Sequence, residues 1–246
     1  MVVPCFNCAA SVSRSVEELR GYLGTLGRSW EVVLVDDGST DDAASVLSEL
    51  ADERTHVVTL AVNRGKGAAV AAGMRRARGE CRVFTDSDLP YELDGLTECV
   101  VGVLDRRQPA VFGNRLLEAS DASAQPRLRR WIGRLVRAVA GSIVGRHDVD
   151  TQCGLKAFSG PVANALFPML RTEGFLFDVE VVLLLSKARI PISFVPVRLT
   201  AQDGSTVGFL QTGPETVRAL WRLYRMSRAP MDMRVLEAST SDRPAR

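Results

Sequence analysis

The sequence has no apolar run near the roughly 20 residues that cross a bilayer, and its start lacks the charged region and cleavage site of a signal peptide. A cytoplasmic protein is therefore expected. A hydrophobic content of 46% and a mean hydropathy of +0.04 exclude a disordered chain and favour a globular one. The first predicted strand follows Met1 directly, so we expect either a natural start further upstream or a strand exposed at its beginning.

Neither the few cysteines nor the small net charge defines a function. Of five cysteines, only Cys5 and Cys8 have the spacing of half a zinc site, and no second half follows. Buried thiols are the expectation. The net charge of +2 does not indicate a nucleic-acid partner. Its distribution is uneven, because residues 125–147 hold six arginines and no acid.

Three nucleotide-binding signatures are missing. There is no P-loop, because Lys66 is followed by Gly67 rather than Ser or Thr, and no G-x-G-x-x-G follows the first predicted strand. The glycine-rich loop of sugar nucleotidyltransferases is also absent, since that strand runs into the residues PCFN at 4–7. These nucleotide-binding classes are excluded.

Short apolar runs alternate with stretches of helical period in the first half of the chain. Strands are predicted at 2–5, 31–35, 56–60, 81–85 and 110–114, and helices at 11–26, 41–53, 66–78 and 91–105. This alternation predicts an α/β fold with a parallel sheet and right-handed crossovers. Ligands of such sheets bind at the carboxyl ends of the strands.

After about residue 115 the alternation stops, and no repeat or linker marks a second domain. We expect one domain over 1–212, an amphipathic helix over 213–230 and a disordered tail over 231–246. The helix carries Leu220, Trp221 and Tyr224 among four arginines. This composition suits a membrane interface and equally suits core packing.

Carboxylates follow two of the predicted strands. Asp36 and Asp37 end one, and Asp86 and Asp88 follow another. Side chains two residues apart in an extended strand point to the same side, so Asp86 and Asp88 can face one ligand. Such hard oxygen ligands suit Mg²⁺ or Mn²⁺ bridging phosphates. An isolated D-x-D more often marks a solvated turn, but two acidic strand ends in one sheet favour a site.

A basic glycine-rich turn lies between the two acidic strand ends. Residues 63–67, NRGKG, lead from a predicted strand into an alanine-rich helix. Glycine permits close backbone approach, while Arg64, Lys66 and the helix N-terminus favour an anion. The alternative is a plain capped helix after a turn.

Seven segments in order make the sequence resemble a known family. They are VPCFN, VVLVDDGSTD, NRGKGAAVAAGM, FTDSDLP, GNR, DTQCGLKAF and FDVE. Over about residues 2–200 the chain resembles family 2 glycosyltransferases of GT-A fold, in the branch of dolichyl- or polyprenyl-phosphate glucosyl and mannosyl synthases. The last two segments favour the glucosyltransferases. The resemblance implies a GT-A, Rossmann-like, mostly parallel sheet flanked by helices. It also implies inverting, metal-dependent hexose transfer from a nucleoside diphosphate sugar.

The resemblance also implies residue roles. Residues that would contact the donor nucleotide or its sugar are Pro4, Phe6, Asp36, Asp37, Arg64, Lys66, Asp86 and Gln152. Those at the reacting centre would be Lys66, Asp88 and Asp150, with Asp86 and Asp88 on Mg²⁺ or Mn²⁺. Those that would hold the acceptor phosphate are Arg115, Arg130 and Arg134. Asp178 and Glu180 are expected as structural partners of arginines.

Two positions depart from the family pattern. Cys8 stands where the family usually has Glu, which leaves one nucleoside contact without its usual residue. Pro90 stands where many mannosyl synthases have a Gln that binds metal, which weakens GDP-mannose as donor and favours a UDP-sugar.

The acceptor is expected to be a polyprenyl phosphate, because apolar residues interleave the arginines of 115–137. Contact with the inner face of the membrane would then be peripheral. Two alternatives stay open. A soluble hydroxyl acceptor would need a base, with Asp150 first in line. A noncatalytic protein would bind the nucleotide sugar without turnover.

Overall fold

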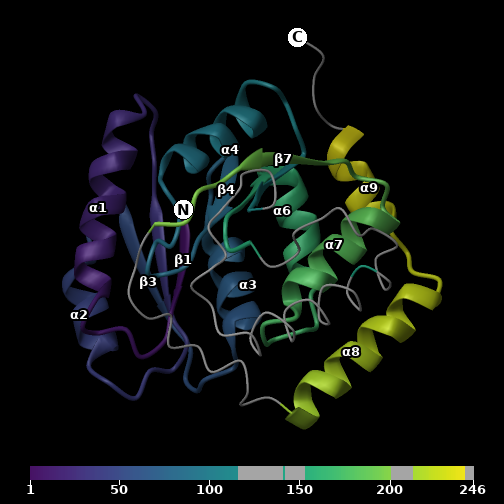
Figure 1. Ribbon diagram of the computed structural model, residues 1–246, viewed down its shortest axis with the longest axis horizontal. Helices are drawn as coiled ribbons and strands as arrows, with labels where there is room; N and C mark the ends of the chain where they lie inside the picture. Colours follow the sequence, from purple (N-terminus) through teal and green to yellow (C-terminus); the bar gives the residue numbers. More distant parts are fainter. Residues whose placement is uncertain (116–140, 142–152, 201–212, 242–246) are drawn as a thin grey trace.

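The computed structural model describes residues 1–115, 141, 153–200 and 213–241. A seven-stranded sheet in the order β3-β2-β1-β4-β6-β5-β7 forms the middle layer, with helices on both faces (Figure 1). The strands are β1 Val2–Cys5, β2 Val32–Asp36, β3 Thr55–Thr59, β4 Cys81–Phe84, β5 Ala110–Asn114, β6 Lys156–Ser159 and β7 Ile192–Pro196. The predicted strands end within one residue of the observed ones.

Two helical layers bury the faces of the sheet. One face packs against α1 Val12–Thr25, α2 Ala43–Glu49 and α4 Asp94–Leu104. The other packs against α3 Lys66–Arg76, α6 Gly160–Leu166, α7 Phe177–Lys187 and α9 Arg234–Ser241. A short 3₁₀ turn, Phe167–Met169, follows α6, and α8 Gly213–Arg228 packs on α7. The α/β class and single-sheet organisation predicted from the sequence are confirmed.

The sheet is mostly parallel, as predicted. β1 pairs in parallel with β2 and β4, β2 with β3, and β5 with β7. β6 is the exception and runs antiparallel between β4 and β5. Parallel strands buried on both faces read as continuous apolar runs, and β1 is buried from its first residue, so its beginning is not exposed.

A glycine sets how closely α3 approaches the sheet. A Cβ on Gly73 would collide with the side chain of Val2 and would lie 2.8 Å from Cγ2 of Val35. Only glycine therefore permits this helix to lie directly on β1 and β2. The close packing fixes the N-terminus of α3, where Lys66 lies, at the carboxyl edge of the sheet.

The expectation of a disordered tail over 231–246 is wrong for its first part. α9 begins at Arg234, and the side chains of Met233 and Leu236 are buried in the core beside α6. These two residues and Met231 are apolar and pack into the core cluster that includes α6. Most other residues of the segment are polar, so its composition did not predict a packed helix. Residues 242–246 lie outside the described residues.

No helix in the described part of the chain combines the length and apolar character needed to cross a membrane.

We expect Leu236→Ala to lower the free energy of unfolding by about 3 kcal/mol, because it removes a fully buried side chain and leaves a cavity. Urea denaturation followed by circular dichroism measures this. The matched control is Val235→Ala on the same helix, where the side chain is 70% exposed; it should change stability by less than about 0.5 kcal/mol. Equal effects of the two substitutions would contradict the docking of α9.

Candidate functional site

The acidic and basic residues singled out in the sequence meet at one edge of the sheet. β2 and β4 flank β1 and run parallel to it, so their carboxyl ends lie together. Asp36 ends β2, and Asp86 and Asp88 follow β4. Lys66 begins α3, the helix that follows β3. The topology therefore gathers the two acidic pairs and the basic turn at the edge where α/β sheets bind ligands.

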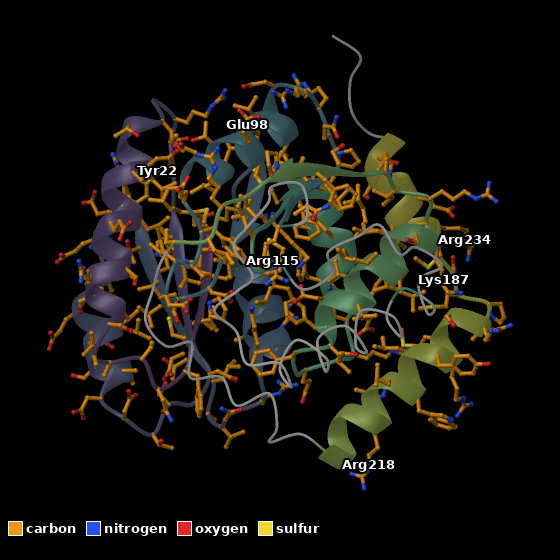
Figure 2. The ribbon with its side chains drawn as sticks, viewed as in Figure 1. Tyr22, Glu98, Arg115, Lys187, Arg218 and Arg234 are labelled. Carbon is orange, nitrogen blue, oxygen red and sulfur yellow. The ribbon has the colours of Figure 1, made fainter. Side chains whose placement is uncertain are left out.

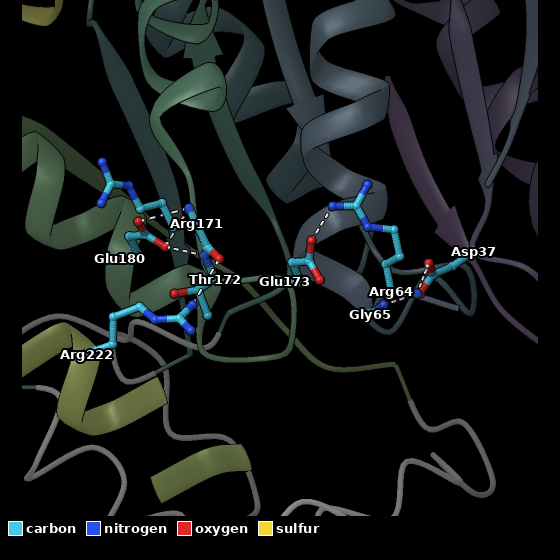
Figure 3. A network of polar contacts seen from close by, with 8 residues as sticks. All are labelled: Asp37, Arg64, Gly65, Arg171, Thr172, Glu173, Glu180 and Arg222. Carbon is cyan, nitrogen blue, oxygen red and sulfur yellow. Dashed lines mark hydrogen bonds and ion pairs between the residues drawn. The ribbon is translucent and has the colours of Figure 1, made fainter. Parts of the chain in front are cut away.

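The adjacent acids at the end of β2 are stabilised by backbone donors. The two carboxylate oxygens of Asp37 accept the backbone N–H groups of Arg64, at 2.9 Å, and of Gly65, at 2.7 Å (Figure 3). Asp36 Oδ1 accepts the N–H of Ser39 at 3.0 Å. Burial raises the pKa of Asp37, although both backbone donors act in the opposite direction. Asp37 therefore fastens the Arg64–Gly65 turn to β2, which is a structural role the sequence did not reveal.

Two glycines permit the loops at this edge to touch. Gly38 has a φ of +65°, and a Cβ there would lie 2.5 Å from the backbone nitrogen of Asn63. Gly65 has a φ of +100°, and a Cβ there would lie 2.7 Å from the carbonyl oxygen of Glu173. L side chains rarely adopt either φ, so both positions require glycine. The loops after β2, after β3 and before α7 thus form one packed rim.

The loop after β1 is fastened to the same rim. The N–H of Asn7 donates to Ser39 Oγ at 3.0 Å, and the side-chain oxygen of Asn7 accepts the N–H of Thr40 at 2.8 Å. This leaves Pro4 half-buried and the ring of Phe6 44% exposed at the mouth of the site.

Three of the five cysteines are buried thiols, as expected. All five are free, and those that are fully buried are Cys5, Cys99 and Cys153. Cys8 is half-buried, and its hydrogen bond with Cys5 lowers the pKa of Cys8.

Lys66 is surrounded by carboxylates. Its Nζ forms an ion pair with Asp86 Oδ1. Burial alone would lower the pKa of Lys66, but the negative charges of Asp86 and Asp178 outweigh it and raise the pKa. Lys66 is thus a cation held at the start of α3, where the helix N-terminus also favours an anion.

A second lysine lies beneath this pair and was given no role from the sequence. Lys156 on β6 is fully buried, and its Nζ donates to the Cys153 carbonyl at 2.5 Å and to Asp178 Oδ1 at 2.7 Å. Nζ also lies 5.4 Å from the ring centroids of Phe84 and Phe112. A buried charge is tolerated when it is paired and hydrogen-bonded, so Asp178 and Lys156 continue the charged row that begins with Asp86 and Lys66.

Among the described residues, the two acids of FDVE have partners other than the expected arginine side chains. Asp178 pairs with a lysine, Lys156. Glu180 is fully buried, and its carboxylate accepts the backbone N–H groups of Arg171 and Thr172. Glu173, to which the sequence gave no role, forms the ion pair with Arg64 instead (Figure 3).

Gly154 and Tyr91 hold Asp86 from the other side. A Cβ on Gly154 would collide with the carboxylate of Asp86, so any other residue here would displace that carboxylate. The N–H of Gly154 donates to the hydroxyl oxygen of Tyr91 at 2.9 Å. Burial raises the pKa of Tyr91, and the positive charge of nearby Arg115 acts in the opposite direction. Arg115, which follows β5, therefore lies near Tyr91, and Figure 2 shows it near the centre of the view, in contrast to Arg218 and Arg234 at the periphery.

The remaining expected site residues are Arg130, Arg134, Asp150 and Gln152, and they lie outside the described residues.

Asp86 and Asp88 fit a divalent cation shared with a ligand. Burial and the negative charge of Asp86 together raise the pKa of Asp88, and a cation would relieve this repulsion. Within the described ranges no group of three or more His, Cys, Asp or Glu side chains could hold a metal ion. Two carboxylates completed by phosphate oxygens and water are a common way to bind Mg²⁺.

Comparisons of the sequence with known proteins point to one family. A model of the family described as glycosyl transferase family 2 matches residues 1–158. The dolichyl-phosphate beta-glucosyltransferase of Drosophila melanogaster is 32% identical over 245 residues, which cover 91% of this chain and 74% of that protein. That of Saccharomyces cerevisiae is 28% identical over 225 residues, with coverages of 83% and 67%. One from Trichomonas vaginalis is 29% identical over 209 residues, with coverages of 80% and 62%.

Solved structures share the fold. The glucosyl-3-phosphoglycerate synthase from Mycobacterium tuberculosis in complex with UDP has a TM-score of 0.66 at 22% identity, covering 94% of this chain and 80% of that one. The same enzyme with Mn²⁺, UDP-glucose and phosphoglyceric acid has a TM-score of 0.65 at 20% identity, with coverages of 94% and 80%. The predicted GT-A fold is confirmed.

We expect Lys156→Met to cost about 3 kcal/mol of stability at neutral pH, because it leaves the buried carboxylate of Asp178 without its closest partner. The pKa of Asp178 is already raised above its ordinary 3.8 by burial. Its ionised form therefore destabilises the variant above that raised pKa, and the cost should shrink as the pH falls through it. Urea denaturation at several pH values measures both effects.

The double variant Lys156→Met with Asp178→Leu serves as the control. It removes both charges and leaves apolar side chains of similar size, so it should recover most of the lost stability. A double variant as unstable as Lys156→Met alone at neutral pH would contradict the pairing.

Proposed function

Because the chain belongs to glycosyl transferase family 2, we propose that it transfers a hexose, with inversion, from a UDP-sugar to a dolichyl or polyprenyl phosphate. Glucose is the first candidate sugar, since the curated relatives are named dolichyl-phosphate beta-glucosyltransferases. The chain spans 62% to 74% of the length of the three relatives described above, so their activity enters here as a proposal. The observation that carries it is the Lys66–Asp86 ion pair beside Asp88 at the carboxyl edge of the sheet.

The donor would bind across the rim formed by the three loops. Phe6 and Pro4 offer apolar surface to the nucleoside at the mouth of the site, with Asp36 behind them. The diphosphate would lie at the N-terminus of α3, where Lys66 and Arg64 supply positive charge. Support for a uridine nucleotide comes from the solved structures of the same fold in complex with UDP and with UDP-glucose.

Asp86 and Asp88 would hold Mg²⁺ or Mn²⁺, which when bound neutralises negative charge on the diphosphate. Lys66, which is paired with Asp86, would contribute a second positive charge. Both charges are fixed before the sugar leaves, so little reorganisation is needed when negative charge develops on the diphosphate. Gly154 keeps the carboxylate of Asp86 in place by leaving room for it.

The acceptor phosphate would be held by Arg115, with Arg130 and Arg134 as further candidates. Arg115 follows β5 and lies close to Tyr91, which contacts the segment that packs on Asp86. A phosphate monoester has a second pKa of about 6, so it is largely ionised at neutral pH and can attack without a strong general base. The arginines then act by positioning the nucleophile behind the anomeric carbon.

A soluble acceptor is the second candidate. The solved structure with Mn²⁺ and UDP-glucose also contains phosphoglyceric acid, a small water-soluble molecule. Attack by a hydroxyl group needs a general base, and Asp150 would then be the first residue to substitute.

We expect the protein to form a glucosyl polyprenyl phosphate when it is incubated with UDP-glucose, a short polyprenyl phosphate and Mg²⁺ or Mn²⁺. UDP- and GDP-linked glucose and mannose would be compared against polyprenyl phosphate and 3-phosphoglycerate, with products identified by mass spectrometry. Calorimetric titration in Mn²⁺ should show tighter binding of UDP than of GDP. Faster transfer to 3-phosphoglycerate than to polyprenyl phosphate would favour the soluble acceptor over the lipid. Tighter binding of GDP than of UDP would reverse the donor assignment.

We expect Asp88→Asn to reduce turnover on the order of a hundredfold or more, because it removes one of two carboxylates that would hold the cation. Stability should not fall, since the substitution removes the repulsion between Asp86 and Asp88. Initial rates, with a chelator added to the unsubstituted protein in parallel, measure the effect. The matched control is Glu92→Gln, an exposed acid of the same loop. Turnover that survives both Asp88→Asn and chelation would contradict a metal-dependent mechanism.

A further inference from the structure

Among the described residues, one side of α8 packs on the protein. Leu223 is fully buried and, with the partly buried Ala219, Leu220 and Met226, packs against the residues Leu176, Val179 and Leu183 in and beside α7. Figure 1 shows the helix at the margin of the molecule, beyond α7 and away from the sheet. Its opposite side is therefore available to a partner.

The outer face of α8 consists of Arg218, Trp221, Tyr224, Arg225 and Arg228, all of them exposed. Trp221 is 60% exposed and Tyr224 50% exposed, which is unusual for large aromatic side chains. The guanidinium of Arg225 lies 4.8 Å from the ring of Trp221, and that of Arg228 lies 5.5 Å from the ring of Tyr224. Residues 218–228 contain four arginines and no acid. Aromatic and cationic groups thus form one continuous surface.

We infer that the outer face of α8 docks onto an anionic lipid bilayer. Trp and Tyr rings prefer the level of the headgroups, where their apolar bodies are buried and their polar atoms stay hydrated. Arginine side chains beside them place guanidinium groups among lipid phosphates, and anionic lipids attract such a basic face. The face lies in the plane of the membrane and does not cross it.

The composition favours a membrane over a folded protein or a nucleic acid. A helix that enters a protein groove presents apolar anchors at successive turns, whereas this face alternates two amphipathic rings with charges. Single-stranded nucleic acid binds in a positively charged groove with bases stacked on aromatic rings, whereas this face is one side of a helix at the margin of the molecule. A bilayer accepts both components at once, since its interface is apolar below and anionic above.

Contacts link this face to the donor site. Arg222, from the same helix, donates to the carbonyl oxygen of Arg171 at 3.3 Å. Two residues later in that loop, Glu173 pairs with Arg64, whose N–H is held by Asp37 (Figure 3). Docking would therefore place the donor site beside the bilayer that contains a lipid phosphate acceptor. In this respect the inference rests on the proposed function.

The experiment is flotation with vesicles of phosphatidylcholine containing about 30% phosphatidylserine. The protein should float with them at about 50 mM salt and be released at about 500 mM, because salt screens surface charge. Replacing Arg218, Arg225 and Arg228 by Gln should weaken binding on the order of a hundredfold. Replacing Trp221 and Tyr224 by Ala should also weaken binding at about 50 mM salt, because it removes the rings that would lie at the headgroup level.

The matched control removes the same charge elsewhere. Arg14 on α1 and Arg75 and Arg78 at the end of α3 are exposed and lie off α8, and their replacement by Gln should leave vesicle binding nearly unchanged. Thermal unfolding of every variant should match the parent, because none of the substituted side chains is buried. An α8 variant that unfolds early would be replaced by single substitutions, Arg225→Gln and Trp221→Ala.

Three outcomes would overturn the inference. They are equal loss of binding in the α8 and control variants, equal binding to pure phosphatidylcholine vesicles, and tighter binding to single-stranded RNA or polyglutamate than to the anionic vesicles. Turnover of a water-dispersed short polyprenyl phosphate is measured in parallel to test the proposed function separately. Intact turnover without vesicle binding contradicts only the docking surface, and vesicle binding without turnover contradicts only the proposed reaction.

Discussion

The position of Lys66 among carboxylates is the constraint on which the rest of the site depends. Buried charges are stable only when they alternate in sign and keep their hydrogen bonds. The row Asp86, Lys66, Asp178 and Lys156 meets this condition. In the antiparallel register of β6 beside β4, Lys156 lies opposite Phe84 and beneath the site. The charges are thus held by the sheet and two helix starts.

Carboxylates that accept backbone N–H groups fix the loops around this row. Asp37 holds the turn that carries Arg64, and Glu180 holds the loop that carries Glu173. The ion pair between Arg64 and Glu173 then joins the two loops. A binding rim built this way is largely formed before any ligand arrives, which reduces the ordering cost of binding.

Periodicity was enough to predict the first five strands and four helices, because each depends on local apolar spacing. It could not assign β6, whose four residues are buried with a lysine among them, since that lysine is tolerated only through Asp178 on a distant helix. Motif order singled out Lys66, Asp86 and Asp88, which the structure brings together. It could not distinguish the structural role of Asp37 from a role in ligand binding. The backbone N–H group that its carboxylate accepts belongs to Arg64, which lies 27 residues further along the chain.

Position 90 shows how the structure alters the meaning of a departure from the family pattern. Leu89, just after Asp88, has a φ of +44°, a backbone conformation that residues other than glycine rarely adopt. The carbonyl of Pro90 accepts the N–H of Thr200 at 3.0 Å, and Tyr91 bridges to Leu199. Pro90 therefore helps fasten a strained turn to the segment after β7. Since proline has no side-chain donor or acceptor, a cation on Asp86 and Asp88 would draw its other ligands from elsewhere, with donor phosphates as the nearest source.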